Sequence, residues 1–269
     1  MNQTIKNDAT SSCKKMIRLA AFFISALLIV PACFSDTVIL APNRDNTLYE
    51  SMTGTESNGA GDSLFAGRTG VNNNGQIRRG TISFDVASSV PANVTITGVT
   101  LSLFLTQAGS SASGKSVSVS ALTSSWGEGA SVGISGQGGS AMTGDATWLH
   151  RFFNTLFWNT PGGDFDAQPS ATTTIGFAFQ RYSWSSPGLI DDVQSWVANP
   201  ASNFGWIIRG DETATNTALR FSSRETTTAA NRPELSINYL VVPEPSSAAL
   251  LIAALLPSIC AARPWRPGA

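Results

Sequence analysis

The sequence predicts an all-β fold, an antiparallel sandwich with one short helix, for most of this 269-residue chain. Short runs rich in β-branched and aromatic residues alternate with polar positions, as expected of strands that bury one face. Clusters of Gly, Ser and Asn, the residues of turns and loops, separate these runs. A succession of such short strands is typical of a β-sandwich.

The clearest strand covers Val94 to Leu105, where apolar side chains keep to a period of two. Gly98 interrupts this alternation and is the expected position of a β-bulge, because one inserted residue shifts the register once. Similar runs are Thr37 to Leu40, Thr81 to Val86, Ser116 to Leu122, Thr174 to Phe179, Asn203 to Arg209, Ala218 to Ser222 and Leu235 to Tyr239.

One segment, Leu189 to Val197, has the helical period instead. Its apolar residues Leu189, Val193, Trp196 and Val197 fall on one face. Pro187 comes just before it and Asn199-Pro200 just after it, and these are start and stop signals for a helix. We expect a helix of about two turns.

The N-terminal residues 1–35 have the features of a secretory signal peptide. Basic residues come first, namely Lys14, Lys15 and Arg18. The apolar run Leu19 to Val30 and a group of small residues follow, and we expect cleavage after Ser35. The alternative is a lipoprotein motif in which Cys33 carries a lipid, but Pro31 fits that motif poorly.

The C-terminal residues 243–269 combine three features in a fixed order. Pro243-Glu244-Pro245 breaks regular structure, because proline lacks a backbone donor and biases the preceding residue toward an extended shape. The stretch Ser246 to Ala262 follows and contains no charge. Arg263 and Arg266 come after it, as at the cytoplasmic end of a membrane segment.

Together with Val242, this tail resembles a PEP-CTERM sorting signal. The resemblance implies export from a Gram-negative cell, recognition by an exosortase-type peptidase and removal of the tail near Pro243-Glu244-Pro245. The protein would then reach the cell surface or extracellular matrix after a transient stay in the inner membrane, alongside exopolysaccharide production. A lasting transmembrane helix or a buried C-terminal helix is the alternative, since a short apolar run alone proves neither.

Between these ends, residues 36–242 are long enough for one domain with one good core. The 3 cysteines, Cys13, Cys33 and Cys260, all lie outside this region, so the domain makes no internal disulfide. It contains eleven Lys and Arg against sixteen Asp and Glu, a net charge of −5. This balance argues against a nucleic-acid partner.

Tryptophan rings are surfaces on which sugars stack. A Trp on a strand with apolar neighbours, such as Trp206, is more often a core residue. Trp158 and Trp184 instead lie in turn-like segments rich in Gly, Pro, Asn and Ser, where a ring can face solvent. We therefore expect Trp158 or Trp184 to contact a polysaccharide.

Two acid pairs, Asp164 with Asp166 and Asp191 with Asp192, are candidates for catalysis or calcium binding. Solvated loop acids and charges at the start of a helix are the simpler interpretation. A calcium ion that orders the Asp164 and Asp166 loop is the one cofactor this pattern suggests. His150 is the only histidine, and no nucleophile elbow or cluster of metal ligands accompanies it. We therefore assign no catalytic residue.

Residues 36–242 also resemble the DNRLRE domain, a β-sandwich module of exported bacterial proteins that is related to carbohydrate-binding modules. Asp45-Asn46-Thr47-Leu48-Tyr49-Glu50 stands in the place of the family's name motif, with Thr47 and Tyr49 as departures. Other fragments follow in the family's order: Arg79 to Asp85, Trp126 with Glu128, Gly144 to Trp148, Trp158 with Gly162-Gly163-Asp164, Asp192 to Trp196, Phe221 to Glu225 and Arg232 to Leu235.

This resemblance implies a jelly-roll-like sandwich with an accessory or binding role, and no catalytic residue carries over from it. Arginines near acids, such as Arg79 with Asp85 and Arg224 with Glu225, are expected to form pairs that fix the strand register.

Three classes of function stay open. The first is a noncatalytic surface or matrix protein that contacts exopolysaccharide through a face or loop edge of the sandwich. The second is a structural or adhesive module with a protein partner. The third is a polysaccharide hydrolase or lyase, which needs paired acids or a group of Tyr, His and Arg in a cleft. The residues available for such a group are Tyr49, Tyr182, Tyr239 and His150.

Overall fold

A computed structural model describes residues 34–134 and 136–241, and Ser35–Val241 form one compact unit. The expected signal peptide, apart from its last two residues, lies outside the described residues. The tail and its residues Val242, Pro243, Glu244, Pro245, Arg263 and Arg266 lie outside them as well. Ser35, the expected cleavage position, is the second residue of the first strand.

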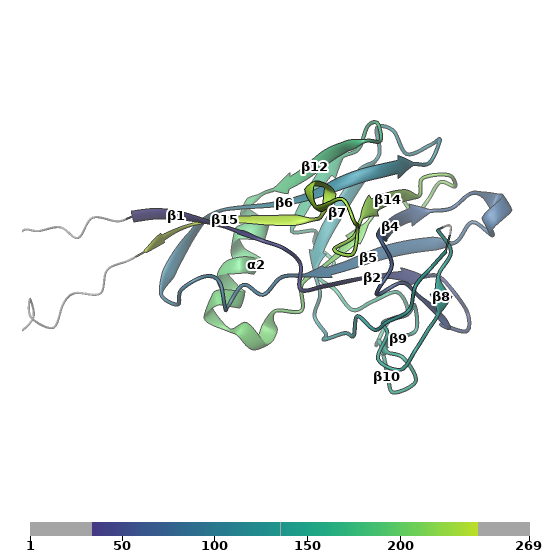
Figure 1. Ribbon diagram of the computed structural model, residues 1–269, viewed down its shortest axis with the longest axis horizontal. Coiled ribbons are helices and arrows are strands. Elements are labelled where there is room, and N and C mark those ends of the chain that lie inside the picture. Colours follow the sequence, from purple (N-terminus) through teal and green to yellow (C-terminus); the bar gives the residue numbers. More distant parts are fainter. Residues whose placement is uncertain (1–33, 135, 242–269) are drawn as a thin grey trace, which may run out of the picture. The chain divides into compact units, whose positions relative to one another are not determined.

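The domain is all-β, as predicted, and is built from a curled antiparallel sheet of 11 strands in a sandwich-like arrangement (Figure 1). We call its two sides the first and second layers. The first layer contains β1 (Phe34–Leu40), β15 (Glu234–Val241), β6 (Val94–Ala108), β12 (Gln180–Ser185), β14 (Leu219–Ser222) and β4 (Ser63–Arg68). The second contains β2 (Arg44–Tyr49), β5 (Ile77–Ser83), β13 (Trp206–Arg209), β7 (Ser116–Ala121) and β11 (Ala171–Thr174).

Strand β4 joins the layers. Its first residues pair with β14, whereas Gly67 and Arg68 pair with β5. Gly67 has a φ of 97°, and a Cβ at this position would lie 2.6 Å from the Thr217 carbonyl oxygen. Because only glycine adopts this conformation without strain, Gly67 allows the sheet to turn from one layer to the other.

The long strand β6 organises the first layer. It pairs with β12, β15 and β14 along different parts of its length. The register with β15 shifts between the partners Gly98 and Ile96, so the predicted bulge next to Gly98 is confirmed. Leu101, Leu103 and Leu105 alternate inward and are fully buried.

Helix α2 (Pro187–Ala198) is the predicted helix, although it is longer than expected. Ser186 caps it by accepting a hydrogen bond from the Leu189 backbone N–H, and Pro187 occupies the first turn. Leu189, Val193 and Trp196 are buried. Within the part of the chain that the structure describes, no helix is long and apolar enough to cross a membrane.

Short elements complete the domain. Two small two-stranded antiparallel sheets pair β3 (Glu56–Ser57) with β8 (Gly139–Ser140) and β9 (His150–Phe152) with β10 (Leu156–Phe157). Single 3-10 turns cover Val71–Asn73, Pro200–Ser202 and Ala229–Asn231.

Two hydrophobic cores hold these elements. The main core fills the space between the layers and includes Trp184, Trp206 and Phe221. A second core lies around Leu48 of β2 and Ile207 of β13, where it is covered by residues from the long segment after β7. Its remaining members are Leu122, Trp126, Ala146, Trp148 and Trp158. The second layer is therefore buried at β2 and β13 by residues that the sequence presents as loops.

Most of the predicted runs are strands, but one is wrong. Residues 175–179 of the run Thr174 to Phe179 form no strand, and Phe177 and Phe179 are 80% and 79% exposed. The alternation that predicted a buried face there ends at Ile175, which is fully buried. Strands β2 and β12 were not predicted, because polar residues interrupt their apolar pattern, and β4 was not predicted because its apolar run Leu64-Phe65-Ala66 is short and does not alternate.

Candidate functional site

A groove crosses the outer face of the first layer over β4, β14 and β6. It consists of three adjoining hollows of about 620, 400 and 250 Å³, which we call the first, second and third hollows. Arg220 lines all three, and we call the whole feature the Arg220 groove. Neighbouring hollows also share Asp62, Ser63, Phe65, Gln107, Gly136 and Gln137. The shared walls make one elongated depression rather than three separate sites.

Strand alternation explains why these side chains meet. In β14, Leu219 and Phe221 point into the main core, so Arg220 between them points outward. Arg220 is opposite Phe65 of β4 on one side and Gln107 of β6 on the other. A row Gln107, Arg220, Phe65 therefore crosses three strands at the centre of the groove.

Arg220 is held by its neighbours on β4. Its Nε donates to the Ser63 hydroxyl at 2.7 Å, and its Nη2 lies 3.4 Å from Asp62 Oδ1. The guanidinium carbon is 6.0 Å from the centre of the Phe65 ring. The Asp62 side chain is 69% exposed, so this ion pair contributes little to stability but fixes the direction of the guanidinium.

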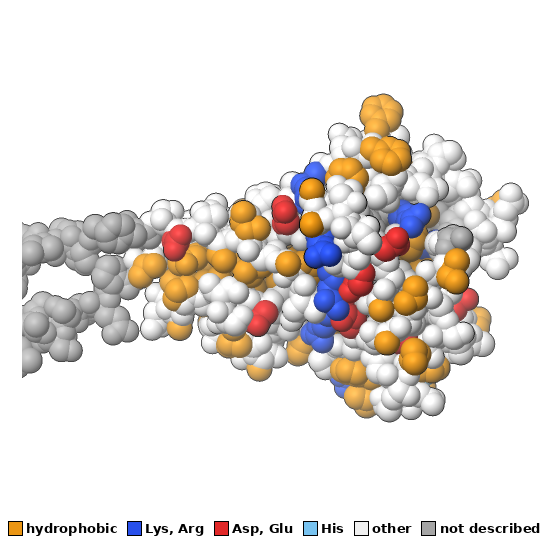
Figure 2. Space-filling view, viewed as in Figure 1, with side chains coloured by type: hydrophobic (Ala, Val, Ile, Leu, Met, Phe, Trp, Pro, Cys, Tyr) orange, Lys and Arg blue, Asp and Glu red, His pale blue; other side chains and the backbone are white. Residues whose placement is uncertain are grey.

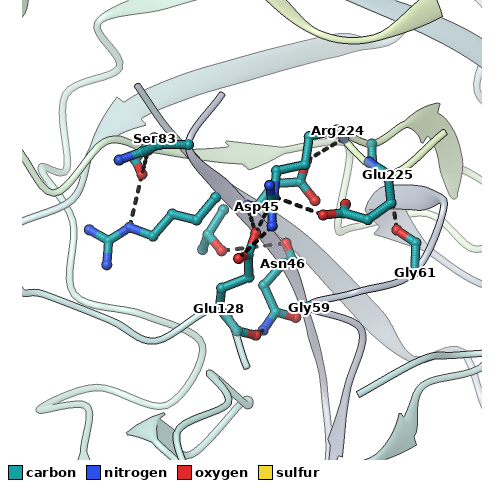
Figure 3. A network of polar contacts seen from close by, with 12 residues as sticks. Asp45, Asn46, Gly59, Gly61, Ser83, Glu128, Arg224 and Glu225 are labelled. Carbon is teal, nitrogen blue, oxygen red and sulfur yellow. Dashed lines mark hydrogen bonds and ion pairs between the residues drawn. The ribbon is translucent and has the colours of Figure 1, made fainter. Parts of the chain in front are cut away.

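A polar network borders the second hollow, which Glu225 helps to line (Figure 3). Arg224 binds both oxygens of Glu128, with distances of 2.6 and 2.9 Å, and its Nε also lies 2.7 Å from Glu225 Oε1. The Arg224 backbone N–H donates to Asp45 Oδ2, and the Asp45 N–H donates to Glu128. Segments far apart in the sequence are thereby tied together beside the groove.

Asn46 extends this network from the Glu128 backbone toward Ser57 and Asn58. Its amide nitrogen donates to the Ser57 hydroxyl and to the Glu128 carbonyl at 2.9 and 2.7 Å. Its side-chain oxygen accepts from the Asn58 backbone N–H at 3.0 Å. Because Asn46 is 1% exposed, these contacts satisfy a polar group that would otherwise be costly to bury.

The pKa values of three residues in the network are shifted. Burial raises the pKa of Asp45 well above its usual value, and the nearby Glu225 carboxylate raises it further. Burial also raises the pKa of Glu225, whereas the hydrogen bond to Glu128 raises the pKa of Arg224. Asp45 Oδ1 and Glu225 Oε2 have no hydrogen-bond partner. Arg224 therefore contacts three acids, Asp45, Glu128 and Glu225, and these contacts hold the loop after β14 in place.

The expectation that Trp158 or Trp184 faces solvent is wrong. Trp184 is fully buried in the main core, where its Nε1 donates to the Val117 carbonyl at 2.9 Å. Trp158 is 4% exposed in the second core and donates to the Thr147 carbonyl at 2.9 Å. Each ring has its one donor satisfied inside the domain, so neither ring is placed to stack on a sugar.

One member of each acid pair, Asp164 or Asp192, already has hydrogen-bond partners within the domain. Asp164 accepts hydrogen bonds from Asn159, Thr160 and Ser124, so these partners order its loop. Asp192 accepts from Trp206 Nε1 at 2.7 Å, and burial raises its pKa. Within residues 34–134 and 136–241, no group of three or more His, Cys, Asp or Glu is arranged to hold a metal ion.

The tyrosines and His150 have separate partners. The Tyr49 ring packs near Phe65 and Arg78, Tyr182 donates to the Phe177 carbonyl, and Tyr239 donates to Asp36. His150 lies beside Thr147 and Phe157, and burial lowers its pKa. The structure therefore does not bring these residues into one reactive group.

The expected arginine pairs are partly right. Arg224 pairs with Glu225, as predicted, but Arg79 pairs with Glu212 at 2.7 Å and not with Asp85. Asp85 instead accepts from the Ser88 backbone N–H in its own turn.

Figure 2 shows Lys and Arg interspersed with Asp and Glu in a band across the middle of one face of the domain.

The exposed residue most relevant to the groove was missed by sequence reasoning. Phe179 lines the first hollow, is 79% exposed and has a φ of 62°, a left-handed conformation that is an outlier for a bulky residue. Such outliers cluster at functional sites. The signal in the sequence was Phe177-Ala178-Phe179 directly after Gly176, but it was assigned to a strand.

No protein-family model matches the chain, and no curated protein is significantly similar to it.

Proposed function

We propose that this chain is an exported, noncatalytic cell-surface or extracellular-matrix protein whose domain contacts exopolysaccharide through the Arg220 groove. The observation that carries the proposal is the groove itself, an open, elongated depression with Arg220 at its centre and the exposed ring of Phe179 in its first hollow. A sugar polymer fits such a depression because it is long, presents hydroxyl groups along its length and has apolar ring faces.

The side chains of the groove suit this ligand. Arginine donates hydrogen bonds, amides and hydroxyls donate and accept them, and aromatic rings cover apolar faces. The groove supplies Arg220, Gln107, Gln137, Ser63 and Thr106 as polar groups. Phe65 forms part of its floor, since this residue is only 6% exposed.

A binding role is favoured over a hydrolase. Asp62 and Glu225 are the acids among the described residues that line the hollows, and each is paired with an arginine. A glycoside hydrolase needs one acid that donates a proton and a second, charged acid across the bond. Acids held by Arg220 and Arg224 are better suited to positioning these arginines.

Export rests on the two ends of the chain. The signal-peptide pattern of residues 1–35 and the resemblance of residues 243–269 to a PEP-CTERM signal support it. In this proposal an exosortase-type peptidase is the transient partner, and the cell is Gram-negative. Ser35 and Val241 lie at the ends of β1 and β15, which are neighbours in the sheet, and Figure 1 shows this end of the domain away from β4 and β14.

Affinity electrophoresis of the full chain through gels containing exopolysaccharide tests the proposal. We expect polysaccharide to retard the parent chain and to retard Phe179→Ala much less. Phe157→Ala is the matched control, because Phe157 is also exposed, at 65%, and lines none of the three hollows.

Equal retardation of the parent and Phe179→Ala would overturn the assignment of the groove. If no polysaccharide retards the parent chain, the alternative of an adhesive module with a protein partner is favoured.

A further inference from the structure

We propose that the third hollow is an anion subsite, in which Arg78 binds a carboxylate or sulfate group carried by an acidic polysaccharide. This inference rests on the proposed function and specifies which chemical group of the glycan the groove recognises. It is carried by the unpaired charge of Arg78, by the composition of the hollow around it and by the location of its guanidinium.

Arg78 is a buried cation that forms no ion pair among the described residues, and Glu56 attracts it only from beyond ion-pair distance. Arg78 is 5% exposed, its Nε has no hydrogen-bond partner, and no ion pair among the described residues includes it. Arginine keeps its charge in proteins, and a buried charge without a partner is costly. A bound anion would supply the missing partner.

Aromatic rings hold the Arg78 guanidinium in place. Its central carbon lies 5.2 Å from the ring centre of Tyr49 and 5.2 Å from that of Phe65. Rings attract a cation through their faces but leave its N–H donors unsatisfied. The guanidinium is therefore fixed in position while its donors remain available.

The third hollow lies next to this guanidinium. Arg78 lines it, and a Cβ built on Gly136, another lining residue, would be 3.7 Å from Arg78 Nη1. None of the described residues that line the hollow is Asp or Glu. Its polar lining consists of Arg78, Arg220, Thr69 and four amides, which are Asn73, Gln107, Gln137 and Asn216.

Two arginines therefore line the hollow, but among the described residues only Arg220 forms an ion pair. Arg220 is paired with Asp62, which lines the first and second hollows and not the third. The planar fork of a guanidinium matches the two oxygens of a carboxylate or sulfate group, and amides add donors at the sides. The net charge of −5 over residues 36–242 repels polyanions in general, so binding of one requires a local site of this kind.

The experiment measures the affinity of the purified full chain for matched polysaccharides. Polygalacturonate is compared with its methyl ester, which has the same backbone without the charge, and dextran sulfate with dextran. We expect the chain to bind at least one charged member about tenfold more tightly than its neutral partner. The two pairs distinguish a carboxylate from a sulfate, and the preference should shrink as salt is added.

Substitutions at Gln107 test the location without disturbing the core, since this side chain is exposed on β6. Gln107→Glu adds a negative charge beside the third hollow and is expected to weaken binding of the charged polymer about fivefold. Gln107→Lys should strengthen it. Both variants should change the affinity for the charged polymer more than the affinity for its neutral partner, because only the charged polymer senses the added charge. Arg78→Met should remove the preference for charge, with the folded state checked by thermal melting.

The outcomes separate the two proposals. Equal affinity for charged and neutral partners, or charged-polymer binding unchanged in both Gln107 variants, would overturn the anion subsite while leaving polysaccharide binding intact. Absence of binding to every polymer would overturn the proposed function itself.

Discussion

Asp45 shows at the scale of one residue how the polar network responds to pH. The carboxyl group is 0% exposed, and one of its oxygens has no hydrogen-bond donor. Arg224 supplies one backbone N–H, but Glu225 adds a second negative charge nearby. Ionisation of Asp45 is therefore disfavoured in the folded domain and is unopposed in the unfolded chain.

The first prediction follows from this raised pKa. Between the unfolded pKa of Asp, about 4, and the higher folded pKa, the folded state binds more protons than the unfolded state. The free energy of unfolding should therefore fall as pH rises through this window, and the stabilisation should be complete below it. Urea titrations from pH 4 to pH 8 measure this dependence.

The Asp45→Asn variant should lose much of this slope, because an amide keeps an acceptor for the Arg224 N–H and cannot ionise. Asp191→Asn, at an exposed position on α2, serves as the control and should keep the slope. An Asp45→Asn variant with the parent's slope would show that another group is responsible.

The second prediction concerns the buried tryptophans. Trp184→Ala should lower the free energy of unfolding by about 3 to 5 kcal/mol, because it removes a large core side chain and a satisfied hydrogen bond. Phe177→Ala, at a side chain that is 80% exposed, should change it by less than about 0.5 kcal/mol. Urea denaturation of both variants checks this contrast, and a mild effect of Trp184→Ala would contradict its place in the core.

At the scale of elements, helix α2 depends on its first turn. Ser186 accepts a hydrogen bond from the Leu189 N–H and donates one to the Ser170 carbonyl. The third prediction is that Ser186→Ala lowers the free energy of unfolding by about 1 kcal/mol. Ser195→Ala, at an exposed position inside the same helix, should have little effect or a slight stabilising one. Equal effects of the two changes would show that capping is unimportant here.

Sequence patterns predicted the elements that bury an alternating apolar face. Strand β6 and helix α2 were found because Leu101, Leu103 and Leu105, or Leu189 and Val193, repeat at the period of their structure. Strand β2 was missed because it is buried on both faces and its buried positions include Asp45 and Asn46, whose burial depends on partners from other segments. The hydrophobic periodicity of a segment does not show which distant residues will contact it.

The candidate site was missed for a related reason. The row Gln107, Arg220, Phe65 exists only after three strands pair, and it joins residues far apart in the chain. Trp158 and Trp184 were chosen because Gly, Pro and Ser surround them, but Trp158 is buried by the long segment after β7 and Trp184 lies on β12. Composition around a residue predicts a turn and does not predict what covers it.

For the chain as a unit, the proposed removal of the tail would determine where the domain acts. The fourth prediction is that the tail is cut between Val242 and Ser246 and that the mature protein ends there. Replacing Arg263 and Arg266 by Glu should leave uncut precursor in the envelope, since arginines beyond an apolar stretch are expected to keep its end on the cytoplasmic side. Mass spectrometry of protein recovered from the cell surface measures the C-terminus, and an intact end at Ala269 would contradict the sorting signal.

The most direct test of the central claim, that the Arg220 groove contacts polysaccharide, is hydrogen exchange of the full chain with and without a polysaccharide that retards it in the gel. We expect slower exchange in peptides covering β14, the end of β6 and residues 176–180. We expect no change in β9 and β10, whose residues 150–152 and 156–157 line none of the three hollows. Protection confined to β9 and β10, with none around Arg220, would contradict this claim.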